Sequence, residues 1–298
     1  MIYPMLCETG NEKDLRRTRF VGEMKLDGTR GLLSKIGNKV EVQNRDGILY
    51  QRRLPELVQA AIKIPHDFTL DGEIVYVDPK TGRSEFTPCQ RRCSTSDIGK
   101  VFYLRSKFPI QFFCFDILTL DGRILEGYKY LERKEEARKL LRKVPDEAIK
   151  YLPHRLDVEE FFEEAKQNQE EGIILKDVKS TYEEARRSYS WLKVKNWRFE
   201  TCDVVGYTQG QNARRPFFGA LVLAKDGRFR GLVGGGFDDM ELRKIRDILR
   251  SSPTRAKPFE VGEDYTPVDT KLRVDVRYYK ITEGGVMRFP GFVRVANP

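Results

Sequence analysis

Histidine is scarce in this chain, and its scarcity limits the chemistry that we expect. Only His66 and His154 occur among 298 residues. Histidine is the side chain that ordinarily titrates near neutral pH and the commonest metal ligand, so catalysis or metal binding by grouped imidazoles has few candidates. We therefore expect any chemistry to depend on lysine, carboxylates and a metal ion.

Cysteines and long apolar segments are also few. The five cysteines are scattered, and only Cys89 and Cys93 lie close together, without a second pair at zinc spacing. This pattern predicts reduced thiols and a cytosolic location. No apolar run approaches the roughly 20 residues that span a bilayer, and the N-terminus lacks the basic and apolar regions of a secretion signal. We therefore expect no membrane association.

The overall composition is that of a globular protein with a basic surface. Hydrophobic residues make up 40% of the chain and charged residues 33%, and the length allows two domains with cores of their own. The formal net charge is +9, which favours a polyanionic partner such as a nucleic acid.

The first two thirds of the chain alternate between strand and helix patterns. Alternating or continuous apolar runs predict strands at residues 18–24, 40–43, 68–77, 110–118, 173–176 and 190–195. Apolar residues at helical spacing predict helices at residues 54–62, 130–144 and 158–170. We place a domain boundary near residues 196–200, which gives domains at 1–198 and 199–298.

The last third has a different pattern, with short strands separated by glycine turns. The expected strands lie at residues 204–207, 220–223, 232–234 and 272–280, with a helix at 238–249. About five short strands with one interior helix in roughly 100 residues predict a small Greek-key barrel of the OB type.

The run from Lys25 to Arg30, with the sequence KLDGTR, is the most informative stretch. A lysine at a strand end beside other cations loses its proton more easily and becomes a nucleophile. The Arg30 guanidinium suits two-point contact with a phosphate. A lysine attacking a nucleotide α-phosphate would give a phosphoramide. Taken alone, the run is more typical of a surface hairpin that turns at Asp27 and Gly28.

Four further short motifs follow the lysine run in order. They are Asp71-Gly72-Glu73, Phe115-Asp116, Glu171-Gly172 and Lys193-Val194-Lys195. The series resembles the motifs of the covalent nucleotidyltransferases, which comprise DNA ligases, RNA ligases and mRNA capping enzymes. The chain is most similar to ATP-dependent DNA ligases, particularly the ligase module of prokaryotic end-joining repair ligases. The resemblance implies an α+β fold, in which a nucleotidyltransferase (ATP-grasp-like) domain of antiparallel sheets and helices precedes an OB-fold barrel.

The resemblance also implies roles for individual residues toward ATP. Lys25 would be the nucleophile that carries AMP, and Glu23 would contact the adenine edge. Arg30 and Arg45 would contact the phosphate and ribose, Glu73 the ribose hydroxyls, and Phe115 would stack on the purine. Considered separately, Phe115 is more typical of a core residue, since Phe112 and Phe113 flank it, and Arg45 of an ordinary turn residue.

The remaining roles concern charge and the metal. Glu171, with Glu73, would bind Mg²⁺ or Mn²⁺, because hard cations prefer carboxylate oxygen, and Asp27 would position Lys25 or the metal. Lys193 and Lys195 would neutralise the phosphates from one strand face, although lysines also protect edge strands from aggregation. Arg288, and to a lesser extent Arg294, would orient the leaving pyrophosphate, in a last motif that departs from the family pattern.

The expected function is an ATP-dependent DNA ligase that seals nicks through lysyl-AMP and DNA-adenylate, in DNA repair or end joining. An RNA ligase, an mRNA capping guanylyltransferase and a non-catalytic OB-type nucleic-acid-binding protein are the alternatives. The expected partners are nicked double-stranded DNA and separate end-joining proteins (a polymerase, a nuclease and an end-binding protein), with the chain itself a monomer.

Overall fold

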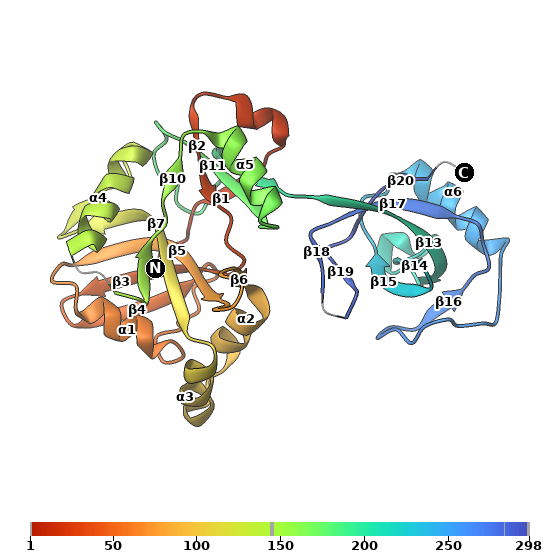
Figure 1. Ribbon diagram of the computed structural model, residues 1–298, viewed down its shortest axis with the longest axis horizontal. Coiled ribbons are helices and arrows are strands. Elements are labelled where there is room, and N and C mark those ends of the chain that lie inside the picture. Colours follow the sequence, from red (N-terminus) through yellow and green to blue (C-terminus); the bar gives the residue numbers. More distant parts are fainter. Residues whose placement is uncertain (1, 144–145, 283, 297–298) are drawn as a thin grey trace. The chain divides into compact units, whose positions relative to one another are not determined.

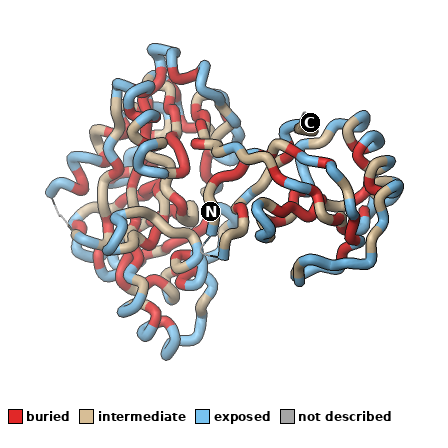
Figure 2. Tube along the Cα trace, turned by 45° about the vertical axis from the view of Figure 1, so that its right-hand side comes forward, coloured by how far each residue is buried: buried red, intermediate tan, exposed pale blue. Residues whose placement is uncertain are grey.

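The computed structural model describes residues 2–143, 146–282 and 284–296, which divide into two compact units. Unit 1 is Met1–Asn196 and unit 2 is Trp197–Pro298. Figure 1 shows that both units combine strands with helices. In each, buried residues follow the strands while exposed residues collect in turns and on the outer sides of helices (Figure 2). The expected α+β fold class is confirmed.

Unit 1 contains two sheets. The first sheet has the strand order β1-β12-β11-β2-β10. Its strands are β1 (Leu6–Thr9), β12 (Arg187–Lys195), β11 (Gly172–Asp177), β2 (Phe20–Met24) and β10 (His154–Arg155). We expected antiparallel sheets, but β1 and β12 of this sheet run parallel.

The second sheet of unit 1 has the order β4-β3-β5-β7-β8, with β6 paired to β5 and β9 paired in parallel to β7. These strands are β3 (Thr29–Ile36), β4 (Lys39–Asn44), β5 (Phe68–Val77), β6 (Ser84–Glu85), β7 (Ile110–Leu120), β8 (Arg123–Ile124) and β9 (Ile149–Tyr151). The 68–77 strand lies where the sequence pattern predicts it, and the 110–118 strand continues to Leu120.

Helices cover both sheets of unit 1. They are η1 (Glu12–Arg16), α1 (Pro55–Ile62), α2 (Phe86–Ser94), α3 (Ile98–Lys107), α4 (Tyr130–Lys143) and α5 (Val158–Gln167). The expected helix at 130–144 includes Val144, which lies outside the described residues. The helix expected at 158–170 ends at Gln167, because Gln169 adopts a left-handed φ of 58°. Two helices, α2 and α3, were not predicted.

The first sheet has one apolar face and one polar face. Phe161, Phe162 and Ala165 of α5 pack on Ile173 and Leu175 of β11 in a buried cluster. Since successive side chains of a strand point to opposite faces, the intervening residues face the other way. That other face carries polar residues from β2, β11 and β12, and they line the pocket described below.

Unit 2 is a small barrel-like arrangement around its own core. Its main sheet has the order β15-β14-β13-β17-β20, with β16 paired to β13, and β18 and β19 form a separate pair. The elements are β13 (Arg198–Thr208), η2 (Asn212–Arg214), β14 (Leu221–Lys225), β15 (Arg228–Val233), α6 (Asp239–Arg250), β16 (Tyr265–Pro267), β17 (Arg273–Tyr278), β18 (Lys280–Ile281), β19 (Met287–Arg288) and β20 (Gly291–Val295). Leu242, Ile245 and Leu249 of α6 join the core of this unit.

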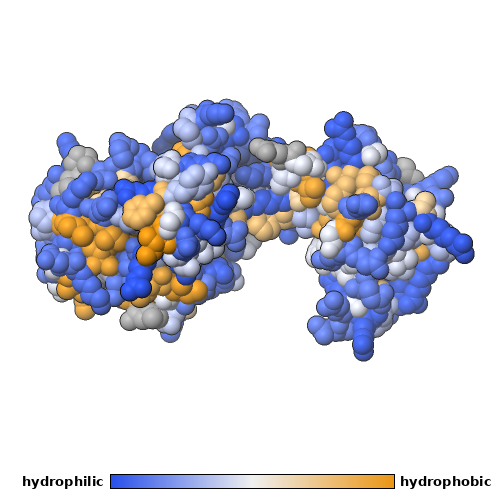
Figure 3. All heavy atoms as spheres, turned by 90° about the horizontal axis from the view of Figure 1, so that it is seen from below, coloured by the Kyte–Doolittle hydropathy of each residue, from blue (hydrophilic) through white to orange (hydrophobic). Residues whose placement is uncertain are grey.

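The surface is largely polar. The face shown in Figure 3 is mostly hydrophilic, with smaller hydrophobic patches on both units. Among the described residues, no helix has the length and apolar character needed to cross a membrane.

Candidate active site

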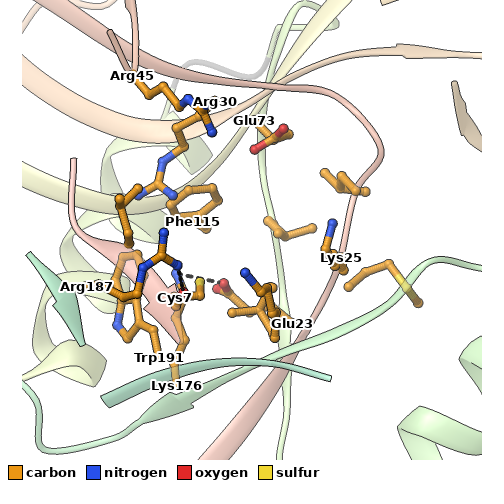
Figure 4. A pocket seen from close by; sticks show the side chains of 16 residues that line it. Cys7, Glu23, Lys25, Arg30, Arg45, Glu73, Phe115, Lys176, Arg187 and Trp191 are labelled. Atoms are coloured by element: carbon orange, nitrogen blue, oxygen red, sulfur yellow. Dashed lines mark hydrogen bonds and ion pairs between the residues drawn. The ribbon is translucent and has the colours of Figure 1, made fainter. Parts of the chain in front are cut away.

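A pocket of about 270 Å³ in unit 1 is lined from both sheets. Side chains of β2, β11 and β12 reach it from the first sheet, and side chains of β3, β5 and β7 reach it from the second. Figure 4 shows how they converge. The residues expected in the site that line this pocket are Glu23, Lys25, Arg30, Arg45, Glu73, Phe115 and Lys193.

Lys25 lies just beyond the end of β2, in contact with the start of β11. Its backbone N–H donates to the Gly172 carbonyl at 3.0 Å. Its Nζ lies 2.5 Å from Oε2 of Glu171, and the other oxygen of this carboxylate lies 3.7 Å from Nζ of Lys195. Glu171 is 6% exposed. Lys25, Glu171 and Lys195, which are far apart in sequence, thus form one partly buried charge cluster at the edge of the pocket.

Gly172 allows this close approach. Its φ of +130° is a conformation that side-chain-bearing residues rarely adopt, and an added Cβ would lie 2.1 Å from the Val194 carbonyl oxygen. β11 can therefore lie against the end of β12 only with glycine here. The resulting register pairs Gly172 with Lys195 and Ile174 with Lys193, which places both lysines on the polar face.

Arg30 is held firmly by a buried carboxylate. Its Nε and Nη2 each donate to an oxygen of Asp71 at 2.5 Å, and Nη2 also donates to the Met5 carbonyl at 3.2 Å. The Tyr182 hydroxyl donates to the same Asp71 carboxylate at 2.6 Å. Bidentate pairing of this kind fixes the plane of the guanidinium. Arg30 therefore presents a pre-oriented cation to the pocket.

Phe115 lies both in the core of unit 1 and at the pocket, and its stacking on a purine stays a prediction. It is 7% exposed and belongs to a buried cluster with Trp191 and Tyr182, yet its ring lines the pocket. The Arg30 Cζ lies 4.5 Å from the ring centroid, and the Lys176 Nζ lies 4.0 Å from it. The ring thus connects the core of unit 1 to the pocket.

Glu73 has a carboxyl whose protonation changes near neutral pH. Its burial raises its pKa to about 7, and Glu171 and Asp71 act in the same direction, although the cations Arg30 and Lys25 oppose the shift. A carboxyl with this pKa is protonated below about pH 7 and ionised above it. Only the ionised form is purely a hydrogen-bond acceptor.

This pKa leads to a prediction about the ribose. If Glu73 accepts a hydrogen bond from a ribose 2′-hydroxyl, ATP will react with the protein faster than 2′-deoxy-ATP above pH 7, and this advantage will shrink as the pH falls below 7. The ratio of the two rates of adduct formation, measured between pH 6 and 8.5, cancels any titration of Lys25. The Glu73→Gln variant should show a low ratio without pH dependence. A wild-type ratio that stays constant across this range would contradict the assignment.

Glu23 lies on β2, between β11 and β10 of the first sheet, and is 1% exposed. Its Oε1 lies 2.5 Å from Nζ of Lys134, and its Oε2 lies 2.9 Å from Nζ of Lys176. Burial alone would raise the pKa of Glu23, but the two lysines hold it below its ordinary value. The carboxylate at the base of the pocket therefore stays ionised.

Several pocket residues were not predicted from the sequence. Ile174 and Lys176 of β11, and Trp191 of β12, line the pocket beside Glu23. The alternation that begins after Glu171-Gly172 is the signal that could have found Ile174 and Lys176. Leu6, Cys7 and Arg187 also line the pocket, but only the pairing of β1 with β12 brings them together.

The residues expected in the site that do not line the pocket are Asp27, Glu171, Lys195, Arg288 and Arg294. Glu171 and Lys195 contact each other at its edge. Asp27 is 7% exposed, and its backbone N–H donates to Oγ of Ser84 at 2.8 Å. Arg288 belongs to β19 of unit 2, where its guanidinium carbon lies 5.0 Å from the centroid of Phe289. Arg294 donates to Asp275 at 2.7 Å within the same unit.

The chain was then compared with known families and proteins. The family described as "ATP dependent DNA ligase domain" matches residues 4–195, and the "ATP dependent DNA ligase C terminal region" matches residues 214–297. The multifunctional non-homologous end joining protein LigD of Mycolicibacterium smegmatis is 31% identical over 97% of this chain. The chain spans 37% of the length of that relative. A probable DNA ligase of Dictyoglomus thermophilum is 29% identical over 91% of this chain and 53% of its own length.

Solved structures agree with these sequence relatives. The ligase domain of LigD from M. tuberculosis is 26% identical and aligns with a TM-score of 0.60, covering 99% of this chain and 95% of that domain. A mycobacterial DNA ligase D complexed with ATP and MES is likewise 26% identical, with a TM-score of 0.57 over 99% of this chain and 95% of that one. The family matches together account for most of the sequence, and the chain belongs to the ATP-dependent DNA ligase family.

Proposed function

We propose that this chain joins nicked DNA strands through a covalent AMP on Lys25. The observation that carries the proposal is the position of Lys25. Its amine lines the pocket together with Arg30, Glu73 and Phe115, and it contacts Glu171. These side chains match what a nucleotide requires: a nucleophile, cations for phosphate, an acceptor for ribose and an aromatic ring for the base.

The proposed chemistry has three steps. The Lys25 amine attacks the ATP α-phosphorus, the α–β phosphoanhydride bond breaks, and pyrophosphate leaves. The 5′-phosphate at the nick then attacks the lysyl-AMP, which frees the amine and forms DNA-adenylate. Finally the 3′-hydroxyl attacks the 5′-phosphorus, a phosphodiester bond forms and AMP leaves. Lys193 lies on the pocket face of β12 and would offset the negative charge that gathers on the phosphates.

Glu171 and Glu73 are the carboxylates proposed to hold a divalent metal ion. Among the described residues no group of three or more potential metal-binding side chains occurs. Mg²⁺ commonly binds through one or two carboxylates, with water and substrate phosphates completing its coordination, so two carboxylates suffice. The ion would supply charge neutralisation and orientation for the phosphates. We propose Mg²⁺ or Mn²⁺ as this ion.

A second, more polar hollow of about 570 Å³ shares Arg30, Arg45 and Glu73 with the nucleotide pocket. It also contains Arg53, whose Nη1 donates to the Cys93 carbonyl at 2.6 Å. Three arginines at one hollow suit a phosphate group. We propose that the 5′-phosphate of the nick enters here, and that basic side chains of unit 2 follow the DNA backbone.

Labelled nucleotides and defined nicks test the proposal. The protein should form a covalent adduct with α-labelled ATP in the presence of Mg²⁺ but not with α-labelled GTP, and peptide mapping should find the label on Lys25. It should seal an all-DNA nick. An adduct with GTP alone would indicate a capping-type guanylyltransferase. Sealing restricted to RNA strands would indicate an RNA ligase, and the absence of any adduct would indicate a non-catalytic binding protein.

We further propose a role in end joining, which rests on the likeness to LigD. Because the chain spans 37% of that relative, the polymerase, nuclease and end-binding functions of such a pathway would belong to other proteins or regions. Sealing of paired DNA ends should then increase when an end-binding protein is added, whereas sealing of a simple nick should not change.

A further inference from the structure

The carboxylate of Glu23 is held from behind by α4. Its Oε1 accepts a hydrogen bond from the Tyr130 hydroxyl at 2.6 Å and lies 2.5 Å from Nζ of Lys134. Tyr130 and Lys134 are 0% and 1% exposed, and neither lines the pocket. The contacts of Oε2 differ, since its recorded partner is Lys176, which does line the pocket.

The two oxygens of Glu23 are thus in different environments. Oε1 is engaged by α4, away from the nucleotide pocket. Oε2 lies next to the pocket cation Lys176 and has capacity for a further donor, because a carboxylate oxygen accepts more than one hydrogen bond. The carboxylate cannot rotate without breaking the contacts of Oε1.

α4 is itself fixed in place. The Nζ of Lys134 also donates to the Leu152 carbonyl at 2.5 Å. Arg133, which precedes Lys134 on α4, donates through Nε and Nη2 to the two oxygens of Asp116, each at 2.8 Å. Asp116 follows Phe115 on β7, so the helix that orients Glu23 is tied to the strand that carries the pocket's aromatic ring.

We infer that Tyr130 and Lys134 are positioning residues that direct one oxygen of Glu23 toward the nucleotide base, and thereby favour a base with an exocyclic 6-amino group. This inference rests on the proposed use of ATP. An ionised carboxylate accepts hydrogen bonds and donates none, so it is suited to an amino group and gives nothing to a purine that lacks one.

The test compares ATP with purine riboside triphosphate, which lacks the 6-amino group. The measured quantity is the ratio of kcat/KM for covalent adduct formation with the two nucleotides. The wild-type protein should prefer ATP on the order of tenfold, as expected for a hydrogen bond to a charged group. In Lys134→Met this ratio should fall toward one, and in Tyr130→Phe, which keeps both lysines, it should fall by a smaller factor.

Two further variants separate positioning from general damage. Lys139→Met changes an exposed lysine of the same helix that pairs only with Glu136 among the recorded ion pairs, and its ratio should equal that of the wild type. Glu23→Gln should lower the ratio, and adding Lys134→Met to it should lower the ratio no further.

The outcomes distinguish this inference from the proposed function. If kcat/KM in Lys134→Met and Tyr130→Phe falls equally for both nucleotides, α4 has only a structural role and the inference is wrong. A wild-type protein that uses both nucleotides equally well also overturns it. If Lys134→Met does not fold, Tyr130→Phe and Lys134→Arg decide. If the wild-type protein forms no adduct with ATP at all, the proposed function itself fails.

Discussion

Replacing Lys25 by alanine is expected to abolish the covalent AMP adduct while the fold is kept. The amine at this position is the proposed nucleophile, and it lies 2.5 Å from the Glu171 carboxylate. Joining of an ordinary nick should therefore also be lost. Labelling with α-labelled ATP measures the loss of the adduct, and circular dichroism measures whether the fold is kept.

The Lys25→Arg variant is the matched control for charge. A guanidinium preserves a cation beside Glu171 but stays protonated at every pH at which the protein would be assayed, so it cannot attack phosphorus. We expect Lys25→Arg to be as stable as the wild type and, like Lys25→Ala, unable to form the adduct.

Sealing of pre-adenylated DNA is a separate test. A nick whose 5′-phosphate already carries AMP should still be sealed by Lys25→Ala, because this substrate does not require the lysyl-AMP step. An adduct formed by either variant would show that the nucleophile lies elsewhere.

The second large effect is expected from Gly172→Ala. An added Cβ would lie 2.1 Å from the Val194 carbonyl oxygen and 2.9 Å from Cα of Lys195, so backbone must move. Either β12 shifts with Lys193 and Lys195, or β11 shifts away from Lys25, whose N–H donates to the Gly172 carbonyl. We expect adduct formation to fall by at least about 100-fold, since misplacement of about 1 Å is enough for such a loss.

The stability of Gly172→Ala should fall as well. Backbone strain and overpacking together should lower the free energy of unfolding by roughly 3 kcal/mol, measured by denaturant titration. Gly122→Ala is the control, because Gly122 also has a positive φ of +77° but no atom within 4 Å of the added Cβ. It should lose about 1 kcal/mol and keep its activity. If both variants behave alike, the close approach of β11 and β12 does not organise the site.

The local motifs identified much of the proposed nucleotide pocket, because residues such as Glu73 and Phe115 lie on strands that the sequence pattern predicts. Glu23 lies on β2 and Lys25 directly follows the end of that strand, while Lys193 and Lys195 are two apart on β12 and share a face. The roles proposed for these residues stay predictions until the experiments above are done. The structure adds that Glu23, Lys25 and Lys193 line one pocket.

Other parts of the site could not be predicted, because they depend on register and burial over long distances. The pattern of α4 indicated a charged amphipathic helix, and nothing in it distinguishes exposed Lys139 from Lys134, which is 1% exposed. Trp191 became a pocket residue through pairing of β12 with β11. The missed helix α2 contains Pro88 and buries Arg92, which pairs with Glu56, so its sequence lacks a clear apolar stripe.

The parallel pairing of β1 with β12 has a consequence for the order of synthesis. Leu6 and Cys7 line the pocket and pair with Arg187 and Ser188 near the end of unit 1. A nascent chain without β12 therefore has an unpaired first strand and an incomplete pocket. At about 5–20 residues per second, roughly 10–40 s separate the translation of the two strands. If ATP binds in this pocket as proposed, it can stabilise unit 1 only after β12 has been made, so the chain from β1 to β11 has to remain in solution without a bound nucleotide until then.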